Sequence, residues 1–375
     1  MGTLSESVGT PSPGVTTLSL RKFAELAQVS PATVSRVFSQ PETVAEKTRL
    51  KVLELAESMG FRPSPIARAA VGGSTKSVGV VLPSLKVSFF ADVLLGLQRR
   101  LLQDDYLPMT LSDEGEDSRV TLRRLVDHRM DALVMGCSDE SLSYQEVYEI
   151  VDPDLPLILI DNVHPGFDCD AVLNDDYAGG RAAGRHLLEL GHEIFGFIHY
   201  GEGTSNCEQR LDGFRCALRE ADIDLPEQHI VNMPPRAESM EKAHAILRQQ
   251  LRKLFSDPRR PTAVFASNDR FALETYLACE ELGLRIPGDL SVIGFADLEF
   301  APFLNPPLTT IRQYGEDMGR RAAELILARL TVDGLPKRTE VIPVELVRRA
   351  STAPPRGTSS LSSIKIPKIE PAQAS

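Results

Sequence analysis

The sequence predicts an N-terminal all-α domain joined to an α/β core of two doubly wound parallel-sheet subdomains. Three observations lead to this prediction. Short capped helical segments come first, strand-sized apolar runs then alternate with amphipathic helices, and the alternating part is long enough for two sheets. The expected boundaries are a tail at 1–17, a helical domain at 18–63, a hinge helix and linker at 64–76, a core at 77–352 and a tail at 353–375. The composition of the tails predicts disorder.

The composition of the 375 residues is that of an ordinary globular protein, with 42% hydrophobic and 25% charged residues. The apolar runs are strand-sized, and the first residues lack a basic start and an apolar stretch, so neither a membrane span nor a secretory signal is predicted. The five cysteines lack C-x-x-C spacing and the seven histidines form no H-x-x-x-H pair, so neither a disulfide framework nor a metal site is expected. These features predict a reducing, cytoplasmic location.

Charge is distributed unevenly along the chain. Residues 18–71 contain eight Lys and Arg and five Asp and Glu, a balance of +3, so the rest of a chain with net charge −11 carries −14. A basic N-terminal part on an acidic body is typical of a DNA-binding domain joined to another domain.

Two short helices are predicted at the start of the N-terminal domain. The first is "LRKFAELAQ", and the second covers residues 31–38. Ser30 is a good N-cap for the second helix, and Pro31 suits its first position, where a missing N–H has no cost. The residues predicted to face each other are Phe23, Ala24, Ala27, Val34 and Val37.

A third helix is predicted to begin at Thr43, because Glu46 follows at capping-box spacing, and to end at Gly60. Its apolar face is predicted from a repeat of every third residue, namely Leu50, Leu53, Ala56 and Met59. Two short helices joined by the turn "QVS" and braced by a third have the proportions of a helix-turn-helix domain.

The second helix has the properties of a helix that enters the major groove of DNA. Such a helix needs a capped N-terminus and short side chains that let its backbone approach the duplex. Arg36 has the chemistry to pair with guanine or with a phosphate. The residues predicted to contact DNA are Ser30, Pro31, Ala32, Thr33, Ser35 and Arg36. On spacing alone, a plain three-helix capping domain remains the alternative.

A short hinge helix is predicted in "SPIARAAVGGSTKS". Ser64 is an N-cap, Pro65 a first-turn residue, and Gly72-Gly73 a stop. A helix of about seven residues does not hold in isolation, so it should order only against a partner such as its twin in a dimer or DNA. An ordinary Gly/Ser linker is the alternative interpretation.

The core is predicted to alternate strands and helices in the manner of parallel α/β proteins. Strands are expected at "SVGVVLP", "LPMTL", "DALVMG", "PLILID", "IFGFIHY", "HIVNM", "TAVFAS" and "SVIGF". Helices are expected at 90–103, 176–190, 211–221, 240–255 and 270–282. No G-x-G-x-x-G follows a strand, and no P-loop or G-x-S-x-G sequence occurs, so the chain lacks the chemistry of a dinucleotide enzyme, a P-loop NTPase or an α/β-hydrolase.

Polar residues follow several predicted strands, at the sheet edge where α/β proteins bind ligands. They are Ser84, Lys86, Asp161, Asn162, Asn268, Asp269 and Asp297, with Arg210 at the start of a predicted helix. These hydrogen-bonding groups predict a cleft that binds a polyhydroxylated or acidic small molecule. The set lacks a paired nucleophile and base, so neither an enzymatic activity nor a cofactor is expected. Each residue taken singly also fits a helix cap or a turn.

Several of these segments resemble one family in order and spacing. "LRKFAELAQVSPATVSRVF" and "TVAEKTRLKVLELAESMGFRPSPIARA" resemble the DNA-binding head and hinge of the lactose-repressor/galactose-repressor (LacI/GalR) family of bacterial transcription regulators. "NDDYAGGRAAGRHLLELGH", "QRLDGF", "PTAVFASND", "LGLRIPGDLSVIGFAD" and "PPLTTIRQ" resemble signatures of its periplasmic-binding-protein-like core.

The resemblance implies a repressor that binds a pseudo-palindromic DNA operator as a cytoplasmic homodimer, or as a tetramer made of two dimers. A sugar-type effector in the cleft would alter the ordering of the hinge and the affinity for the operator. Thr43 and Thr48 fall where the family contacts phosphates, and Arg68 and Ala70 lie in the hinge, with Ala70 where the family inserts a leucine into the minor groove. The residues that match effector ligands of the family are Phe89, Phe90, Asp161, Arg210 and Asn268.

Two departures from the family count against its common neutral-sugar effector. Ala296 replaces an aspartate that usually follows G-[FY], with Asp297 as the nearest carboxylate, and Pro235 stands near the usual aromatic floor. The stretch "GVVLPSLKVSFFADVLLGL" is similar to gluconate-type repressors, which implies a sugar acid whose carboxylate meets Lys86 or Arg210. The rival hypotheses are a cytoplasmic solute-binding or sensor protein and an enzyme on the same core.

Overall fold

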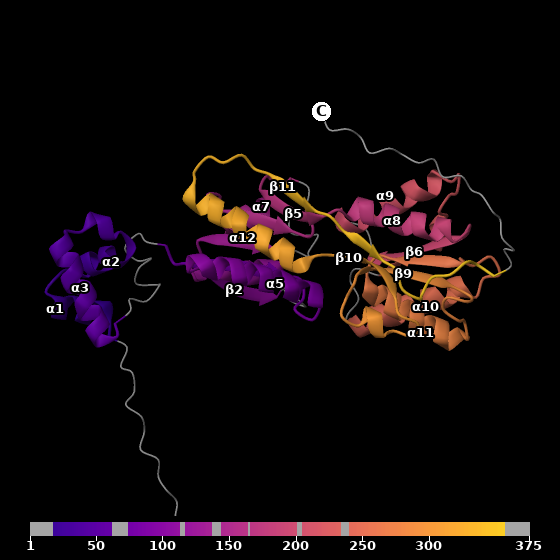
Figure 1. Ribbon diagram of the computed structural model, residues 1–375, viewed down its shortest axis with the longest axis horizontal. Coiled ribbons are helices and arrows are strands. Elements are labelled where there is room, and N and C mark those ends of the chain that lie inside the picture. Colours follow the sequence, from indigo (N-terminus) through magenta and orange to yellow (C-terminus); the bar gives the residue numbers. More distant parts are fainter. Residues whose placement is uncertain are drawn as a thin grey trace, which may run out of the picture. The chain divides into compact units, whose positions relative to one another are not determined.

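The computed structural model describes residues 18–61, 74–112, 117–136, 144–163, 166–200, 205–233 and 240–356 (Figure 1). The predicted hinge residues Arg68 and Ala70, and Pro235, lie outside these ranges. The chain divides into two compact units, one of residues 1–77 with 129–131 and one of residues 78–128 with 132–375.

The first unit contains the three predicted helices of the N-terminal domain. They are α1 (Leu20–Ala27), α2 (Pro31–Ser39) and α3 (Glu46–Met59), with a 3-10 turn, η1 (Pro41–Thr43), before α3. Their common core consists of Phe23, Ala24, Ala27, Val34, Val37, Val52, Ala56 and Phe61. The rings of Phe23 and Phe61 stack with centroids 3.8 Å apart. The predicted inward faces of α1 and α2 are therefore confirmed.

Two predictions about the third helix are wrong. The helix begins at Glu46 rather than at Thr43, whose hydroxyl donates instead to the carbonyl of Gln40 at 2.7 Å. Its buried residues are Val52 and Ala56, four positions apart, whereas Leu50, Leu53 and Met59 are 50%, 38% and 44% exposed. A strict three-residue repeat drifts around a helix of 3.6 residues per turn, so such a series does not stay on one face.

The second unit contains two six-stranded sheets, which confirm the predicted fold class (Figure 1). The first sheet has the order β11-β5-β4-β3-β1-β2 and the second β12-β10-β9-β8-β6-β7. The described strand pairings are parallel, except for the antiparallel pairing of β10 with β12. The chain passes between the sheets after β5, after β10 and between β11 and β12.

The first sheet consists of β1 (Ser77–Leu82), β2 (Leu107–Ser112), β3 (Ala132–Met135), β4 (Leu157–Ile160), β5 (Asp170–Asn174) and β11 (Thr339–Ile342). Its helices are α5 (Ser88–Leu101), α6 (Ser118–Asp127), α7 (Tyr144–Ile150) and α12 (Gly315–Thr331), with the 3-10 turn η2 (Leu102–Asp104). The helices α5 and α12 pack together over a core that contains Val78, Val80 and Leu82 of β1.

The second sheet consists of β6 (Phe195–Tyr200), β7 (Ile230–Met233), β8 (Ala263–Ala266), β9 (Ser291–Ala296), β10 (Thr309–Arg312) and β12 (Glu345–Val347). Its helices are α8 (Asp176–Glu189), α9 (Ser205–Arg219), α10 (Met240–Phe255) and α11 (Asp269–Leu282), with the 3-10 turns η3 (Glu227–His229) and η4 (Ala301–Phe303).

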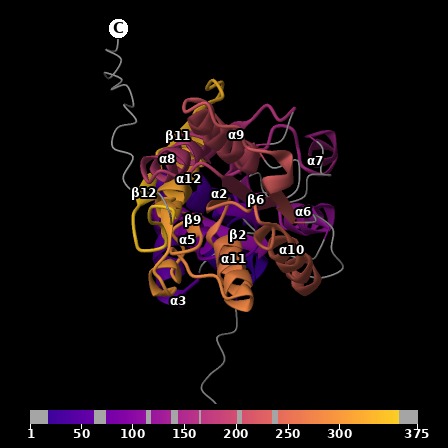
Figure 2. The same cartoon turned by 90° about the vertical axis from the view of Figure 1, so that its right-hand side faces the viewer.

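Successive residues of β8 show that helices cover both faces of the second sheet. Ala263 and Phe265 pack with α8 and α9, whereas Val264 and Ala266 pack with α10 and α11. Neighbouring residues of a strand point to opposite faces, so the two helix pairs lie on opposite sides. Figure 2 shows α10 and α11 side by side, as Figure 1 does. In the described part of the chain, no helix is both long and apolar enough to cross a membrane.

The eight predicted strands are present, and four others were not predicted: β5, β10, β11 and β12. The sequence also did not predict α6, α7 and α12. The predicted start of the helix at Leu211 is wrong, because α9 begins at Ser205 and therefore holds Arg210 within its second turn.

Candidate DNA-binding surface and effector site

The N-terminus of α2 is formed as predicted. The hydroxyl oxygen of Ser30 accepts from the backbone N–H of Thr33 at 3.0 Å and lies 2.8 Å from the hydroxyl of Thr33. Pro31 occupies the first position of the helix. This cap satisfies one of the N–H groups that a helix start leaves without a partner.

Most of the residues predicted to contact DNA lie on the surface of the N-terminal unit. Ser30, Pro31, Arg36 and Thr43 are exposed, and Ala32, Thr33 and Thr48 are partly exposed. Ser35 does not fit the prediction, because its side chain is only 1% exposed. Like Val34 before it, Ser35 lies in the interior of the three-helix domain. Its hydroxyl is therefore not presented at the surface.

In the second unit, the structure brings Asp161 and Arg210 into one buried polar cluster. Asp161 follows β4 and is 9% exposed, while Arg210 lies in α9 and is 5% exposed. The guanidinium donates from Nε to Asp176 Oδ1 at 2.7 Å and from Nη1 to the carbonyl of Ser267 at 2.6 Å. Its central carbon lies 3.7 Å from the centroid of the Phe295 ring. The ion pair, the hydrogen bond and the ring together fix this arginine.

Two asparagine side chains complete the cluster. Asn174, the last residue of β5, donates from Nδ2 to Asp161 Oδ1 at 3.2 Å, and Asn206 of α9 donates to Asp161 Oδ2 at 2.9 Å. Burial raises the pKa of Asp161 and of Asp176, while the charge of Arg210 lowers both. The cluster is therefore a region in which removal from water works against negative charge.

A short hydrogen-bond network beside the cluster joins the two sheets. The amide oxygen of Asn162, which follows β4, accepts from the Ser205 hydroxyl at 3.2 Å and from the Asn206 backbone N–H at 3.1 Å. The Ser205 hydroxyl oxygen accepts from the N–H of Val163 at 3.0 Å. The start of α9 is thus held against the carboxyl end of β4.

The other predicted effector residues have separate surroundings. Phe89 and Phe90 form an edge-on pair, with centroids 5.2 Å apart, at the start of α5. The side chain of Lys86 is exposed, and its backbone carbonyl accepts from Arg270 at 2.6 Å. Asn268 follows Ser267 and caps α11, accepting from the N–H of Phe271 at 2.9 Å.

Asp297, another of the predicted effector residues, is paired with two arginines. One of its oxygens accepts from Arg312 Nε at 2.8 Å and the other from Arg349 Nη2 at 2.6 Å. Two arginines thus neutralise a side chain that comes directly after β9. The residues that sequence reasoning missed are Asn174, Asp176, Asn206 and Phe295, of which Asn174 and Asp176 occur in the quoted "NDDYAGG".

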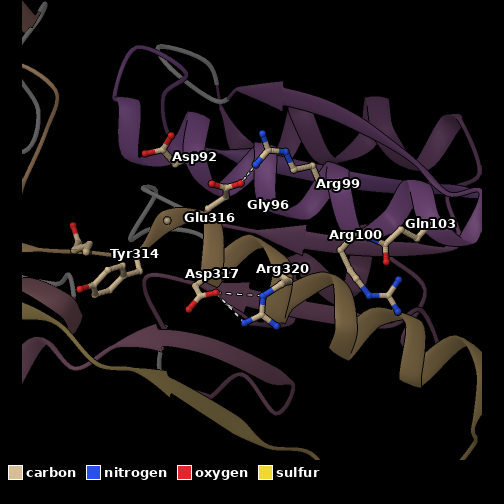
Figure 3. Close-up of a pocket in the computed structure, with 11 residues that line it drawn as sticks. Asp92, Gly96, Arg99, Arg100, Gln103, Tyr314, Glu316, Asp317 and Arg320 are labelled. Carbon is tan, nitrogen blue, oxygen red and sulfur yellow. Dashed lines mark hydrogen bonds and ion pairs between the residues drawn. The ribbon is translucent and has the colours of Figure 1, made fainter.

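A separate cavity of about 510 Å³ opens between α5 and α12 (Figure 3). Four of its charged side chains are paired with one another: Arg99 with Glu316, and Arg320 with Asp317 at 2.9 Å. Arg100 pairs with Asp104, outside the lining. Its lining residues are Asp92, Gly96, Arg99, Arg100, Gln103, Gln313, Tyr314, Gly315, Glu316, Asp317 and Arg320. None of them belongs to the predicted effector set.

Comparison with known proteins decides the family. A model of the lacI family of bacterial regulatory proteins matches residues 19–64, and a model of a periplasmic binding protein-like domain matches residues 185–352. The HTH-type transcriptional repressor PurR of Photobacterium profundum is 31% identical over 336 residues, which cover 88% of this chain and 98% of that protein. The chain belongs to the LacI family.

Other members of the LacI family match over similar lengths. The ribose operon repressor of Haemophilus influenzae is 31% identical over 88% of this chain and 98% of that protein. The crystal structure of a LacI family regulator from Enterococcus faecium with bound ribose has a TM-score of 0.65 and 28% identity, and covers 74% of this chain and 99% of that chain. The lac repressor dimer bound to operator and the anti-inducer ONPF shares the fold, with a TM-score of 0.72 at 24% identity over 89% of this chain and 99% of that one.

As a LacI family member, this protein is a DNA-binding transcription regulator controlled by a small-molecule effector. The relatives are transcriptional repressors, so neither a solute-binding role alone nor an enzyme is favoured.

Proposed function

We propose that the protein is a repressor that binds a pseudo-palindromic operator as a homodimer, and that a small sugar or sugar acid in the cleft controls its operator affinity. The observation that carries the effector half is the buried cluster of Asp161, Asn174, Asp176 and Arg210, where the carboxyl end of β4 meets α9. The exposed, capped N-terminus of α2 supports the DNA-binding half. We place the effector site at this cluster.

Both effector classes have support. The bound ribose of the Enterococcus faecium regulator favours a sugar. The likeness to gluconate-type repressors favours a sugar acid, whose carboxylate would meet Lys86 or Arg210. In either case the protein is proposed to bind the molecule without converting it, because the cluster offers no nucleophile with a neighbouring base.

Self-association is supported by the symmetry of the proposed operator. A dimer would match the two half-sites of a pseudo-palindrome, and a tetramer would pair two such dimers. On the second unit, Phe303 of the turn η4 is 85% exposed and Ile246 of α10 is 39% exposed.

The test is selection of bound sequences from a random DNA pool, followed by measurement of operator affinity with and without sugars and sugar acids. We expect a palindromic sequence to be enriched and at least one compound to change its affinity. Arg36→Ala should weaken the enrichment and relax it at one base pair of each half-site, whereas Arg259→Ala, which removes an exposed arginine of the second unit, should leave it unchanged. Equal recovery of all sequences, or chemical conversion of the compound, would refute the proposal.

A further inference from the structure

We infer that the cleft selects a ligand that donates hydrogen bonds and carries no negative charge, and that Asn174 is one of the residues that bind it. The inference rests on the proposed function, because it concerns the effector of the same cleft. The inference favours a neutral sugar or an amino sugar over a sugar acid as the effector of this cleft.

The first observation is a buried acceptor without a donor. Asn174 is 5% exposed, and its amide nitrogen must face Asp161 because a carboxylate oxygen only accepts. The amide oxygen therefore points elsewhere, and no group of the described residues donates to it. A buried acceptor left in this state destabilises the protein, and a hydroxyl or amine of a ligand would satisfy it.

The second observation is the charge of the cluster. It contains two carboxylates, Asp161 and Asp176, and one guanidinium, that of Arg210, which already donates to Asp176 and to the carbonyl of Ser267. A ligand carboxylate would be a third carboxylate beside a single guanidinium, because Lys86, the other cation considered for it, has an exposed side chain. Such an arrangement is strongly unfavourable, since buried charges require a partner.

The third observation is the direction of the hydrogen bonds at Asp161. Both of its oxygens accept from asparagine amides, yet a carboxylate has about four lone-pair positions, so it can accept from a ligand as well. The carboxylate of Asp161 and the amide oxygen of Asn174 belong to side chains in direct contact. Together they present acceptors to adjacent donors, such as the two hydroxyls of a diol or the hydroxyl and ammonium of an amino alcohol.

The experiment uses the full-length protein and matched compounds that differ in charge. Calorimetry is carried out with ribose, glucose and galactose, with glucosamine and galactosamine, and with ribonate, gluconate and galactonate. We expect at least one neutral or amino sugar to bind and its aldonate to bind at least about tenfold more weakly. An aldonate that binds as tightly as its parent sugar, or a panel in which only aldonates bind, would overturn the inference, as would a panel in which nothing binds.

The role of Asn174 is tested with the compound that binds. Asn174→Leu should weaken its binding at least about fivefold, the effect of losing a buried hydrogen bond. The control is Asn232→Leu, which changes an exposed asparagine of β7. A deoxy analogue that lacks the hydroxyl bound by Asn174 should bind wild type and Asn174→Leu with equal affinity.

If Asn174→Leu does not fold, two other measurements test the role of Asn174. They are the affinities of the deoxy analogues for wild type and the affinity of the sugar for Asn174→Asp. An aspartate keeps an acceptor there, so it should retain binding of an amino sugar.

The two proposals fail in different ways. If an aldonate changes operator affinity, the proposed function stands and this inference falls. If sugars bind but none of them alters DNA binding, the proposed function falls while the preference of the cleft remains measurable.

Discussion

Gly319 of α12 lies directly against the backbone of α5, at Val93. A Cβ atom on Gly319 would come 1.8 Å from the Val93 carbonyl oxygen, and one on Gly96 of α5 would come 1.9 Å from the carbonyl oxygen of Glu316. The two helices therefore approach each other through glycine backbones, and their spacing depends on residues without side chains.

Gly319→Ala is expected to lower the stability of the second unit. Alanine gains about 1 kcal/mol of helix preference over glycine. The clash with a backbone carbonyl forces the helices apart, and overpacking of this kind costs about 1–3 kcal/mol or more. We expect a net loss, read as a lower midpoint of urea unfolding. Gly288→Ala is the control, since its nearest neighbour would be the Arg356 side chain at 3.4 Å. Equal midpoints for the two variants would contradict the argument.

His192 is expected to make stability depend on pH. Its Nε2 lies 2.9 Å from the carbonyl of Ala353 and must donate, so its Nδ1, 2.9 Å from the Thr262 hydroxyl, accepts in the neutral ring. Burial lowers the pKa of His192 from 6.5 to about 4. The unfolded chain therefore binds more protons between these values.

The free energy of unfolding should accordingly rise from pH 4 to 6.5, with the contribution of His192 fully present above 6.5 and lost as the pH falls through about 4. His192→Gln should reduce this slope, measured by urea unfolding at several pH values. His128→Gln, at an exposed position, is the control substitution. An unchanged slope in His192→Gln would show that other groups produce it.

Arg36 is expected to read a base. Arg36→Ala should weaken the complex with the selected operator by about 1–3 kcal/mol and relax the preference at one base pair of each half-site. Arg36→Lys keeps the charge but loses the planar fork, so it should restore binding to random DNA more than binding to the operator. Fluorescence anisotropy on both DNAs measures the difference. Equal losses on the two DNAs would mean that Arg36 contacts only a phosphate.

Ser30 is expected to hold the first turn of α2 even without DNA. Ser30→Ala removes the acceptor for the Thr33 N–H and should destabilise the helix start by about 1 kcal/mol. Hydrogen exchange of the full-length protein should then be about fivefold faster in residues 31–39. Ser30→Asn, which keeps a capping oxygen, should exchange nearly as slowly as wild type. The same acceleration in both variants would rule out the cap as the cause.

Strands that form apolar runs were predicted from the sequence, and short strands that contain polar residues, such as β5, β10 and β11, were not. The run "SVGVVLP" is apolar enough to identify β1 by itself. In contrast, β11 is the four residues Thr339–Ile342, half-exposed and charged, and forms a strand because it pairs with β5. Short polar segments carry little periodicity, so only the pairing partner reveals them.

The candidate effector site likewise contains residues that the sequence predicted and residues that it did not. Asp161 and Arg210 were predicted because polar residues follow strands or open helices at the ligand-binding edge of such sheets. The roles of Asn174, Asp176 and Asn206 were not, since each depends on a contact with a residue at least 13 positions away in the sequence. Asp297 shows the reverse case, a residue in the expected position whose carboxylate is taken by Arg312 and Arg349.

The sequence by itself determined the order of domains, the cap of α2 and the apolar strands, because each of these depends on residues a few positions apart. Only the tertiary structure decided which of the predicted site residues are buried and which are already paired. It paired Arg210 with Asp176, buried Ser35, and left the amide oxygen of Asn174 without a donor among the described residues. Hydrogen bonds and ion pairs between distant residues depend on how the chain crosses between its two sheets, and local sequence patterns do not contain that information.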